Sequence, residues 1–167
     1  MVKKRFESVD REVDTINNGS SLEERDLNMY EAILRQTKKF NEHNDCTVVA
    51  TAITFGVPYK LAHEVLRKMG RKQGRGVRYW LILDELAERI SAITGKTYKI
   101  EEVDLEKIRA KKGSGVTGMT VADWLPKRGR FLCGSNGHVA AVRGGEMHDW
   151  SANRKTRITK ILKVKTL

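Results

Sequence analysis

Three residues in this chain are of the types that together carry out nucleophilic catalysis: Cys46, His138 and Asp149. Cys46 follows Asn44 and Asp45, and either of these two could cap a helix that begins at the cysteine. The unpaired N–H groups and the positive dipole end of a helix favour a thiolate. The negative charge of Asp45 opposes this effect. The thiolate therefore needs a cationic neighbour, and a protonated histidine is the usual one.

The segment around His138 predicts how an imidazole and a carboxylate could meet. His138 begins the apolar run HVAAVR, and the Gly-Gly pair at 144–145 predicts a two-residue turn into EMHDW. In that register Ala140 faces Asp149, so Asp149 is the diagonal neighbour of His138, about 7 Å away. We expect Asp149 to accept a hydrogen bond from Nδ1–H of His138, leaving Nε2 for a thiol, as in a catalytic triad.

The elements that must position these residues change type along the chain. Helical spacing of apolar residues recurs in four segments, the first opened by a capping box of Ser21 and Glu24: 21–39, 46–56, 58–70 and 79–94. The second half predicts a strand, a short helix, a brief helical turn and three strand-rich stretches: 97–103, 104–112, 120–126, 131–135, 138–150 and 158–167. Helices followed by antiparallel strands indicate an α+β fold.

Length and composition are those of one folded domain. The chain has 167 residues, 40% of them hydrophobic and 32% charged, and no apolar run near the ~20 residues of a membrane helix. We interpret residues 1–20 as a polar arm without a secretory signal, and 21–167 as a single domain. Cys46 and Cys133 are too few for a disulfide framework. We expect a cytoplasmic protein with no membrane partner.

The net charge of +11 predicts attraction to an acidic partner. A glycine-interrupted stretch at 67–78 holds six cations and no acid: Arg67, Lys68, Arg71, Lys72, Arg75 and Arg78. These side chains could neutralise nucleic-acid phosphates or steer an acidic protein, or they could be a solvated loop. The alternative hypothesis is therefore a basic nucleic-acid-binding protein without catalysis, whose affinity falls steeply with salt and survives Cys46→Ala.

Two segments resemble papain-like cysteine peptidases. NDCTVVATAITFGVPY is similar to the nucleophile helix of that superfamily, as in ovarian-tumour-type deubiquitinases and double-glycine leader peptidases, and GHVAAVRGGEMHDW resembles its histidine strand, turn and aspartate strand. The resemblance implies a papain-like fold, with Cys46 as nucleophile, His138 as general base and acid, and Asp149 as orienter. It implies hydrolysis of an amide bond in a protein or peptide, by a protease, deamidase or isopeptidase without a cofactor. Similar small proteins occur in bacteriophages, which implies a host-cell cytoplasm.

One position departs from that family. Many papain-like enzymes have a glutamine six residues before the cysteine to complete the oxyanion hole, and here Phe40 stands there. Asn41 and Asn44 are the candidate substitutes, or the backbone N–H groups of 43–46 could serve. The departure also allows an inactive relative that kept the fold and acts by binding.

The remaining histidines and the tryptophans are assigned to structure. His148 falls on the sheet face opposite Asp149, His63 lies mid-helix, and His43 is too local to Cys46 to act as its base. No Cys-x-x-Cys or His-x-x-x-His pair supports a metal site, so none is expected. The three tryptophans lie beside apolar positions, and we expect them in the core, with the last one also shielding the triad from water: Trp80, Trp124 and Trp150.

Overall fold

The structure is a computed structural model that describes residues 22–113 and 115–167, with side-chain surroundings from Met29 onward. The arm predicted for 1–20 and the capping box predicted at Ser21 lie outside the described residues. Helices within that part are α2 (Leu22–Lys39), α3 (Cys46–Phe55), α4 (Tyr59–Lys68), α5 (Tyr79–Thr94), α6 (Leu105–Lys112) and α7 (Val121–Trp124). Strands are β1 (Tyr98–Glu102), β2 (Arg130–Ser135), β3 (His138–Arg143), β4 (Glu146–His148) and β5 (Lys160–Thr166). The predicted α+β layout is confirmed.

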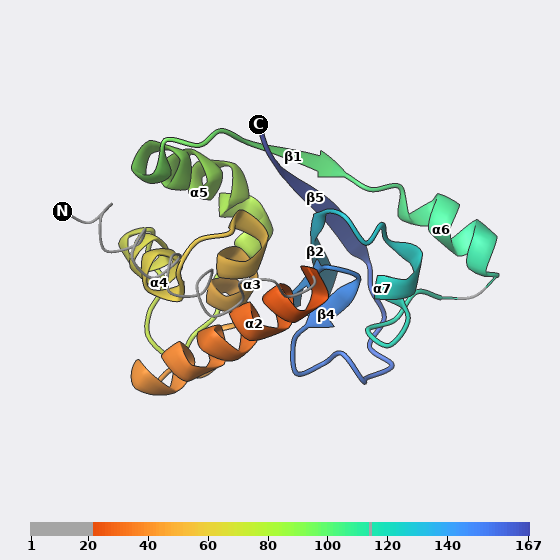
Figure 1. Cartoon of the computed structure of the whole chain (residues 1–167), viewed down its shortest axis with the longest axis horizontal. Coiled ribbons are helices and arrows are strands. Elements are labelled where there is room, and N and C mark those ends of the chain that lie inside the picture. The colour runs from red at the N-terminus through yellow and green to blue at the C-terminus, as the bar shows by residue number, and fades with distance from the viewer. Residues whose placement is uncertain (1–21, 114) are drawn as a thin grey trace.

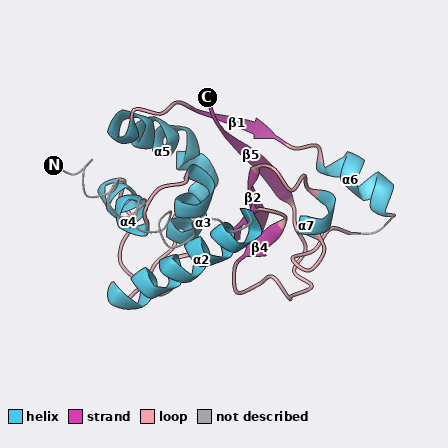
Figure 2. Cartoon of the chain, in the orientation of Figure 1, coloured by secondary structure: helices cyan, strands magenta, loops and turns pink. Residues whose placement is uncertain are grey.

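The five strands form one antiparallel sheet in the order β1-β5-β2-β3-β4. Helices α2 to α5 gather on one side of this sheet, and α6 and α7 lie on the other (Figure 1). Figure 2 shows the strands running between these two groups of helices. The last strand, β5, is an interior strand that pairs with β1 on one side and β2 on the other.

Alternation along the strands gives each face of the sheet its own core. Leu132, Ala141 and Val164 pack with the buried residues of α3, α4 and α5. Phe131 and Val142, one residue away in sequence, pack with Val121, Leu125 and their neighbours under α7. This period-two division is what a strand buried on both faces requires.

Helix α3 is buried along its whole length from Thr47 to Phe55, because it lies between the sheet and the other helices. A helix that is apolar all round belongs in such a position. The buried hydroxyls of Thr51 and Thr54 are hydrogen-bonded: each donates to the backbone carbonyl four residues earlier, at 2.6 and 2.7 Å. Gly56 ends the helix in the left-handed region at φ 64°. This packing fixes the place of the first residue of α3, Cys46.

The β3–β4 hairpin has the predicted register. Ala141 pairs with His148, Val142 with Met147, and Arg143 with Glu146. Both turn residues have positive φ, 64° at Gly144 and 78° at Gly145, as a primed two-residue turn requires. Strand β4 ends at His148, so Asp149 is the first residue after the sheet.

In the part of the chain that the structure describes, no helix has both the length and the apolar character needed to cross a lipid bilayer.

Candidate active site

Cys46 is the first residue of α3, and its side chain is partly buried. Asp45 is the N-cap, but its carboxylate does not cap the helix. Instead it accepts hydrogen bonds from the hydroxyls of Thr37 at 3.0 Å and Tyr59 at 2.9 Å. Because the carboxylate is held by α2 and α4, no side-chain acceptor occupies the N–H groups that begin α3. The positive end of the helix therefore acts on the sulfur without a side-chain cap.

His138 and Asp149 form a direct ion pair, with 2.7 Å between Nε2 and Oδ2. The prediction that these two residues meet across the hairpin agrees with this geometry. The predicted ring nitrogen is wrong: Nε2 bonds the carboxylate, and Nδ1 is the nitrogen left for the sulfur. Asp149 lies beyond the end of β4 rather than within it, so the diagonal register on which the prediction rested does not extend to it.

The thiol of Cys46 lies close enough to the same ring to act on its pKa. The pKa of His138 is raised to about 10, first by its hydrogen bond to Asp149, then by its hydrogen bond to Cys46, against the opposing effect of burial. An imidazole with this pKa is cationic at neutral pH, which is the state that stabilises a thiolate beside it. The three residues named by the sequence are thus brought together.

A short turn after β4 holds the carboxylate in place. Oδ2 of Asp149 also accepts from the backbone N–H of Ser151 at 3.0 Å and from the Ser151 hydroxyl. Ser151 is buried, and its carbonyl accepts from the N–H of Arg154 at 2.9 Å. Sequence reasoning missed Ser151, although an Asp followed two residues later by Ser is a common turn in which the carboxylate bonds the backbone.

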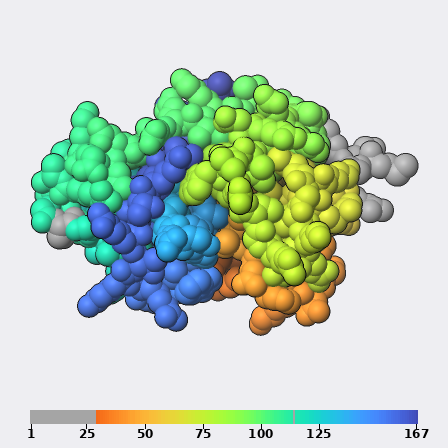
Figure 3. Space-filling view, turned by 180° about the vertical axis from the view of Figure 1, so that it is seen from behind, coloured from red at the N-terminus to blue at the C-terminus, as the bar shows by residue number. Residues whose placement is uncertain are grey.

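Cys46 and His138 open into one cleft of about 580 Å³. Its walls are the segment 76–81, which includes the start of α5, and the β2–β3 turn. Figure 3 shows the yellow-green surface of the first segment beside the blue surface of the second. Trp80 lies over Gly134, where a Cβ would be 2.5 Å from the indole, so glycine is required for this contact. The site is therefore open to a ligand rather than sealed in the core.

Glu42 organises the loop before Cys46 and was not predicted. It is buried, and its carboxylate bonds His63 at 2.7 Å, Arg71 at 2.6 Å and the N–H of Gly74 at 2.8 Å. Burial would raise the pKa of Glu42, but these three partners outweigh burial and lower it to about 2. In the sequence Glu42 is only one acid of a polar loop, because its partners are at least 21 residues away.

Arg71 corrects the predicted polyanion-binding cluster. Its side chain is 1% exposed and paired with Glu42, so it is a structural residue that no polyanion can reach. Lys68 is exposed and lies 3.8 Å from Glu64. The remaining predicted cations are exposed: Arg67, Lys72, Arg75 and Arg78. Of the six, Arg78 alone lines the cleft that the described residues form beside Cys46.

The predicted oxyanion residues lie in the loop before α3. Asn41 and Asn44 are exposed, both have φ near 51°, and neither is among the described residues that line the cleft. The side-chain amide of Asn44 donates to the carbonyl of Gly74 at 3.0 Å, which ties the loop to segment 72–78. Backbone N–H groups at the start of α3 are the remaining candidate donors, since the first helical bond is Val49 N–H to the Asp45 carbonyl.

Other predictions for aromatic residues had mixed outcomes. His148 is buried and packs against Tyr30 of α2 at 5.4 Å, so it has the structural role that was expected. The prediction of core positions is wrong for Trp124 and Trp150, which are 39% and 68% exposed. Trp150 follows Asp149 where the chain leaves the sheet, and its ring lies 5.1 Å from that of His138. It therefore covers one edge of the imidazole from outside.

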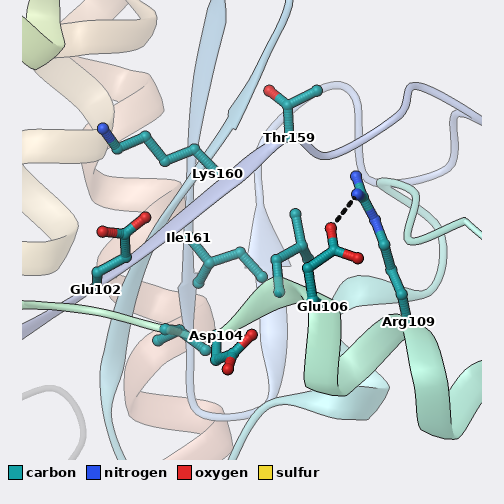
Figure 4. Close-up of a pocket in the computed structure, with 9 residues that line it drawn as sticks. Glu102, Asp104, Glu106, Arg109, Thr159, Lys160 and Ile161 are labelled. Carbon is teal, nitrogen blue, oxygen red and sulfur yellow. Dashed lines mark hydrogen bonds and ion pairs between the residues drawn. The ribbon is translucent and has the colours of Figure 1, made fainter.

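A second cavity of about 440 Å³ lies beyond the start of β5. Figure 4 shows acidic side chains of Glu102, Asp104 and Glu106 around it, with Glu106 paired to Arg109 at 2.6 Å. Thr159 lines both this cavity and the cleft, so the two are neighbours. Among the described residues, no three His, Cys, Asp or Glu side chains group closely enough to hold a metal ion.

Comparisons with protein-family models, with curated proteins and with solved structures found no match to this chain. The function is therefore argued from the geometry of the site.

Proposed function

We propose that this protein is a thiol-dependent amide hydrolase of the papain-like cysteine peptidase type, with Cys46 as nucleophile, His138 as acid and base, and Asp149 as orienter. One observation carries the proposal: an imidazole fixed by a carboxylate shares an open cleft with a sulfur at the start of a helix. The order of helix, histidine strand and aspartate turn supports the papain-like relationship, as do the two resembling segments.

In the proposed reaction, the thiolate of Cys46 attacks the carbonyl carbon of the substrate amide. The oxyanion that forms lies at the N–H groups beginning α3, where the helix dipole stabilises negative charge. The imidazolium of His138 donates the Nδ1 proton to the leaving amine, and the C–N bond breaks to give a thioester. Water then gives a proton to Nδ1 and attacks the thioester, which releases the acid and regenerates the thiolate.

Asp149 acts in this reaction without touching the substrate. Its bond to Nε2 fixes the ring orientation and stabilises the cationic form. Ser151 in turn fixes the carboxylate. Phe40 stands where many papain-like enzymes have the glutamine of the oxyanion hole, and its ring packs 5.6 Å from that of Tyr59 and 4.9 Å from that of His63. Backbone N–H groups therefore take the place of the glutamine as oxyanion donors.

The test is the rate at which iodoacetamide alkylates Cys46 between pH 5 and 9. We expect Cys46 to react faster than glutathione below pH 7, because the His138 cation and the start of α3 lie beside the sulfur, and we expect His138→Ala to remove the difference. Cys133→Ala is the matched control and leaves the rate unchanged, since Cys133 is 1% exposed. A rate equal to that of glutathione in both the wild type and His138→Ala would contradict the proposal.

A further inference from the structure

The cleft beside Cys46 has a positive wall and no negative one. Arg78 lines it, and no aspartate or glutamate is among the described residues that do so. Lys160 places its ammonium 5.4 Å from the ring centre of Trp80, another lining residue. Neither Arg78 nor Lys160 forms an ion pair with an acid among the described residues. Arg78 is thus the cation of the cleft that is available to a ligand, while Lys160 lines the neighbouring second cavity and adds positive charge from behind Trp80.

The backbone that carries Arg78 is held firmly on both sides. Upstream, Gly74 is bonded by Glu42 and by Asn44. Downstream, Tyr79 is buried, and its hydroxyl lies 2.9 Å from that of Thr51 in α3. Arg78 itself is exposed and is the N-cap of α5. The backbone of Arg78 is therefore held in place in the cleft wall, and its exposed guanidinium can contact a ligand.

The same wall offers apolar surface. Val77 and Trp80 line the cleft, and Leu81 beside them is 77% exposed. The opposite wall is the polar turn of Asn136 and Gly137. An exposed leucine and an indole next to the guanidinium of Arg78 are complementary to a peptide that carries an acidic and an apolar side chain, rather than to a purely charged polymer.

We infer that the substrate of this site is a peptide segment with an acidic side chain near the amide that is cleaved, and that Arg78 binds its carboxylate with Lys160 adding to the attraction. This inference rests on the proposed function and specifies its substrate class. A guanidinium is well suited to a carboxylate because it can donate two parallel hydrogen bonds.

The second cavity limits where the acidic side chain can lie. Glu102 and Asp104 line that cavity together with Lys160 (Figure 4). A peptide that passed Thr159 in this direction would meet those carboxylates. Acidic residues are therefore favoured over the cleft and disfavoured at positions that reach the second cavity.

The experiment is a positional-scanning library of fluorogenic peptide amides, in which each of four positions before the scissile bond is varied in turn. We expect kcat/KM to be about tenfold higher for Glu than for Gln at one position, and lower still for Lys, as a charge-assisted hydrogen bond would give. Raising the salt concentration to about 0.5 M should shrink the preference. Equal rates for Glu, Gln and Lys at all four positions would overturn the inference while the proposed function stood.

Charge reversal sharpens the test. Arg78→Glu should invert the preference so that the Lys peptide is cleaved faster than the Glu peptide. Arg75→Glu is the matched control, since Arg75 is exposed in the same loop and does not line the cleft. It changes the net charge equally and should keep the preference for Glu. The same loss of preference in both variants would show that total charge, and not Arg78, selects the substrate, and would overturn the inference.

A binding measurement separates this inference from failure of the chemistry. The Cys46→Ser protein is titrated into fluorescein-labelled hexapeptides with central Glu-Glu, Gln-Gln or Lys-Lys, and anisotropy is recorded. Tighter binding of the Glu peptide, weakened by Arg78→Glu, supports the inference even if no peptide is cleaved. A single-stranded oligonucleotide that binds more tightly than the Glu peptide and displaces it from the cleft would overturn it in favour of nucleic acid.

Discussion

The described residues include two histidine–carboxylate pairs of the same length. His138 and Asp149 are 2.7 Å apart, and so are His63 and Glu42. Each carboxylate is nearly or fully buried, at 5% and 0% side-chain exposure. Judged by the pair alone, either would pass for the acid–base half of a catalytic triad.

The two pairs differ in what else they contact. Glu42 has a second cation, Arg71, and the N–H of Gly74, so its charge is taken up by the loop. Asp149 has the neutral Ser151, and its histidine faces a sulfur in an open cleft. A buried ion pair is therefore no mark of a catalytic site by itself. The third neighbour and access to a cleft decide which pair can do chemistry and which holds the fold.

The largest expected difference between the two pairs is in catalytic activity. Asp149→Asn keeps the shape of the side chain but removes the charge, and should lower kcat/KM by roughly 10²- to 10⁴-fold because the imidazolium loses its partner. Glu42→Gln removes the same charge from the other pair, and the folded fraction should keep kcat/KM within about threefold. The measurement is hydrolysis of one fluorogenic peptide amide by both variants. Equal losses would mean that the two pairs are not distinguished as described.

The next largest expected difference between the two pairs is in the free energy of unfolding. Glu42→Gln leaves the guanidinium of Arg71 buried without its counter-charge and should lower the free energy of unfolding by about 3–5 kcal/mol. Asp149→Asn should cost clearly less, since His138 can become neutral. Urea denaturation at pH 7 followed by tryptophan fluorescence gives both values. A double variant, Glu42→Gln with Arg71→Met, should recover part of the loss; no recovery would argue against an uncompensated charge as the cause.

Gly74→Ala tests how the Glu42 pair reaches the cleft wall. Gly74 has φ 74°, and a Cβ there would lie 2.9 Å from Nε2 of His43. We expect a loss of about 1–2 kcal/mol in unfolding free energy from the left-handed backbone. Gly76→Ala is the control, since its Cβ would meet nothing within 4 Å. An Ala at 74 as harmless as one at 76 would show that segment 72–78 is not held as described.

The smallest effect uses pH to separate the two pairs. The pKa of His138, about 10 in the folded protein against 6.5 ordinarily, means that its stabilisation is complete below about pH 6.5 and is lost as pH rises to 10. The pKa of Glu42, about 2 against 4.5, means that its stabilisation is complete above about pH 4.5 and is lost as pH falls to 2. Differences in unfolding free energy between wild type and His138→Gln or Glu42→Gln should therefore vanish at opposite ends of the pH range. Parallel pH profiles for the two variants would contradict this.

Local patterns in the sequence were enough to predict most of the frame of the site. The apolar spacing after Cys46 and the glycine at 56 defined α3, and the Gly-Gly turn fixed which residue faces which in the β3–β4 hairpin. Such features depend on hydrogen bonds between residues close in sequence. They predicted that His138 and Asp149 meet, whereas the approach of Cys46 to this pair was implied by the resemblance to papain-like enzymes.

The parts that could not be predicted depend on distant residues. The pairing of Glu42 with Arg71 spans 29 residues, and nothing in either segment indicates it. Because of this pairing Arg71 is buried, although it belongs to a stretch whose sequence suggests a solvated loop. The ring nitrogen that meets Asp149 depended on where β4 ends, a boundary that alternation alone does not define. The exposure of Trp150 follows from the same ending, since the next residue no longer faces a sheet neighbour.

The second cysteine, Cys133, can report when the sheet of the folded domain opens. Cys133 lies in β2, the strand between β3 and β5, and burial raises the pKa of its thiol. A thiol reagent can modify it only when the sheet separates, whereas Cys46 lies at an open cleft. Mass spectrometry of one timed labelling reaction would thus give two separate rates: the rate at Cys46 reports the reactivity of the site, and the rate at Cys133 reports opening of the domain.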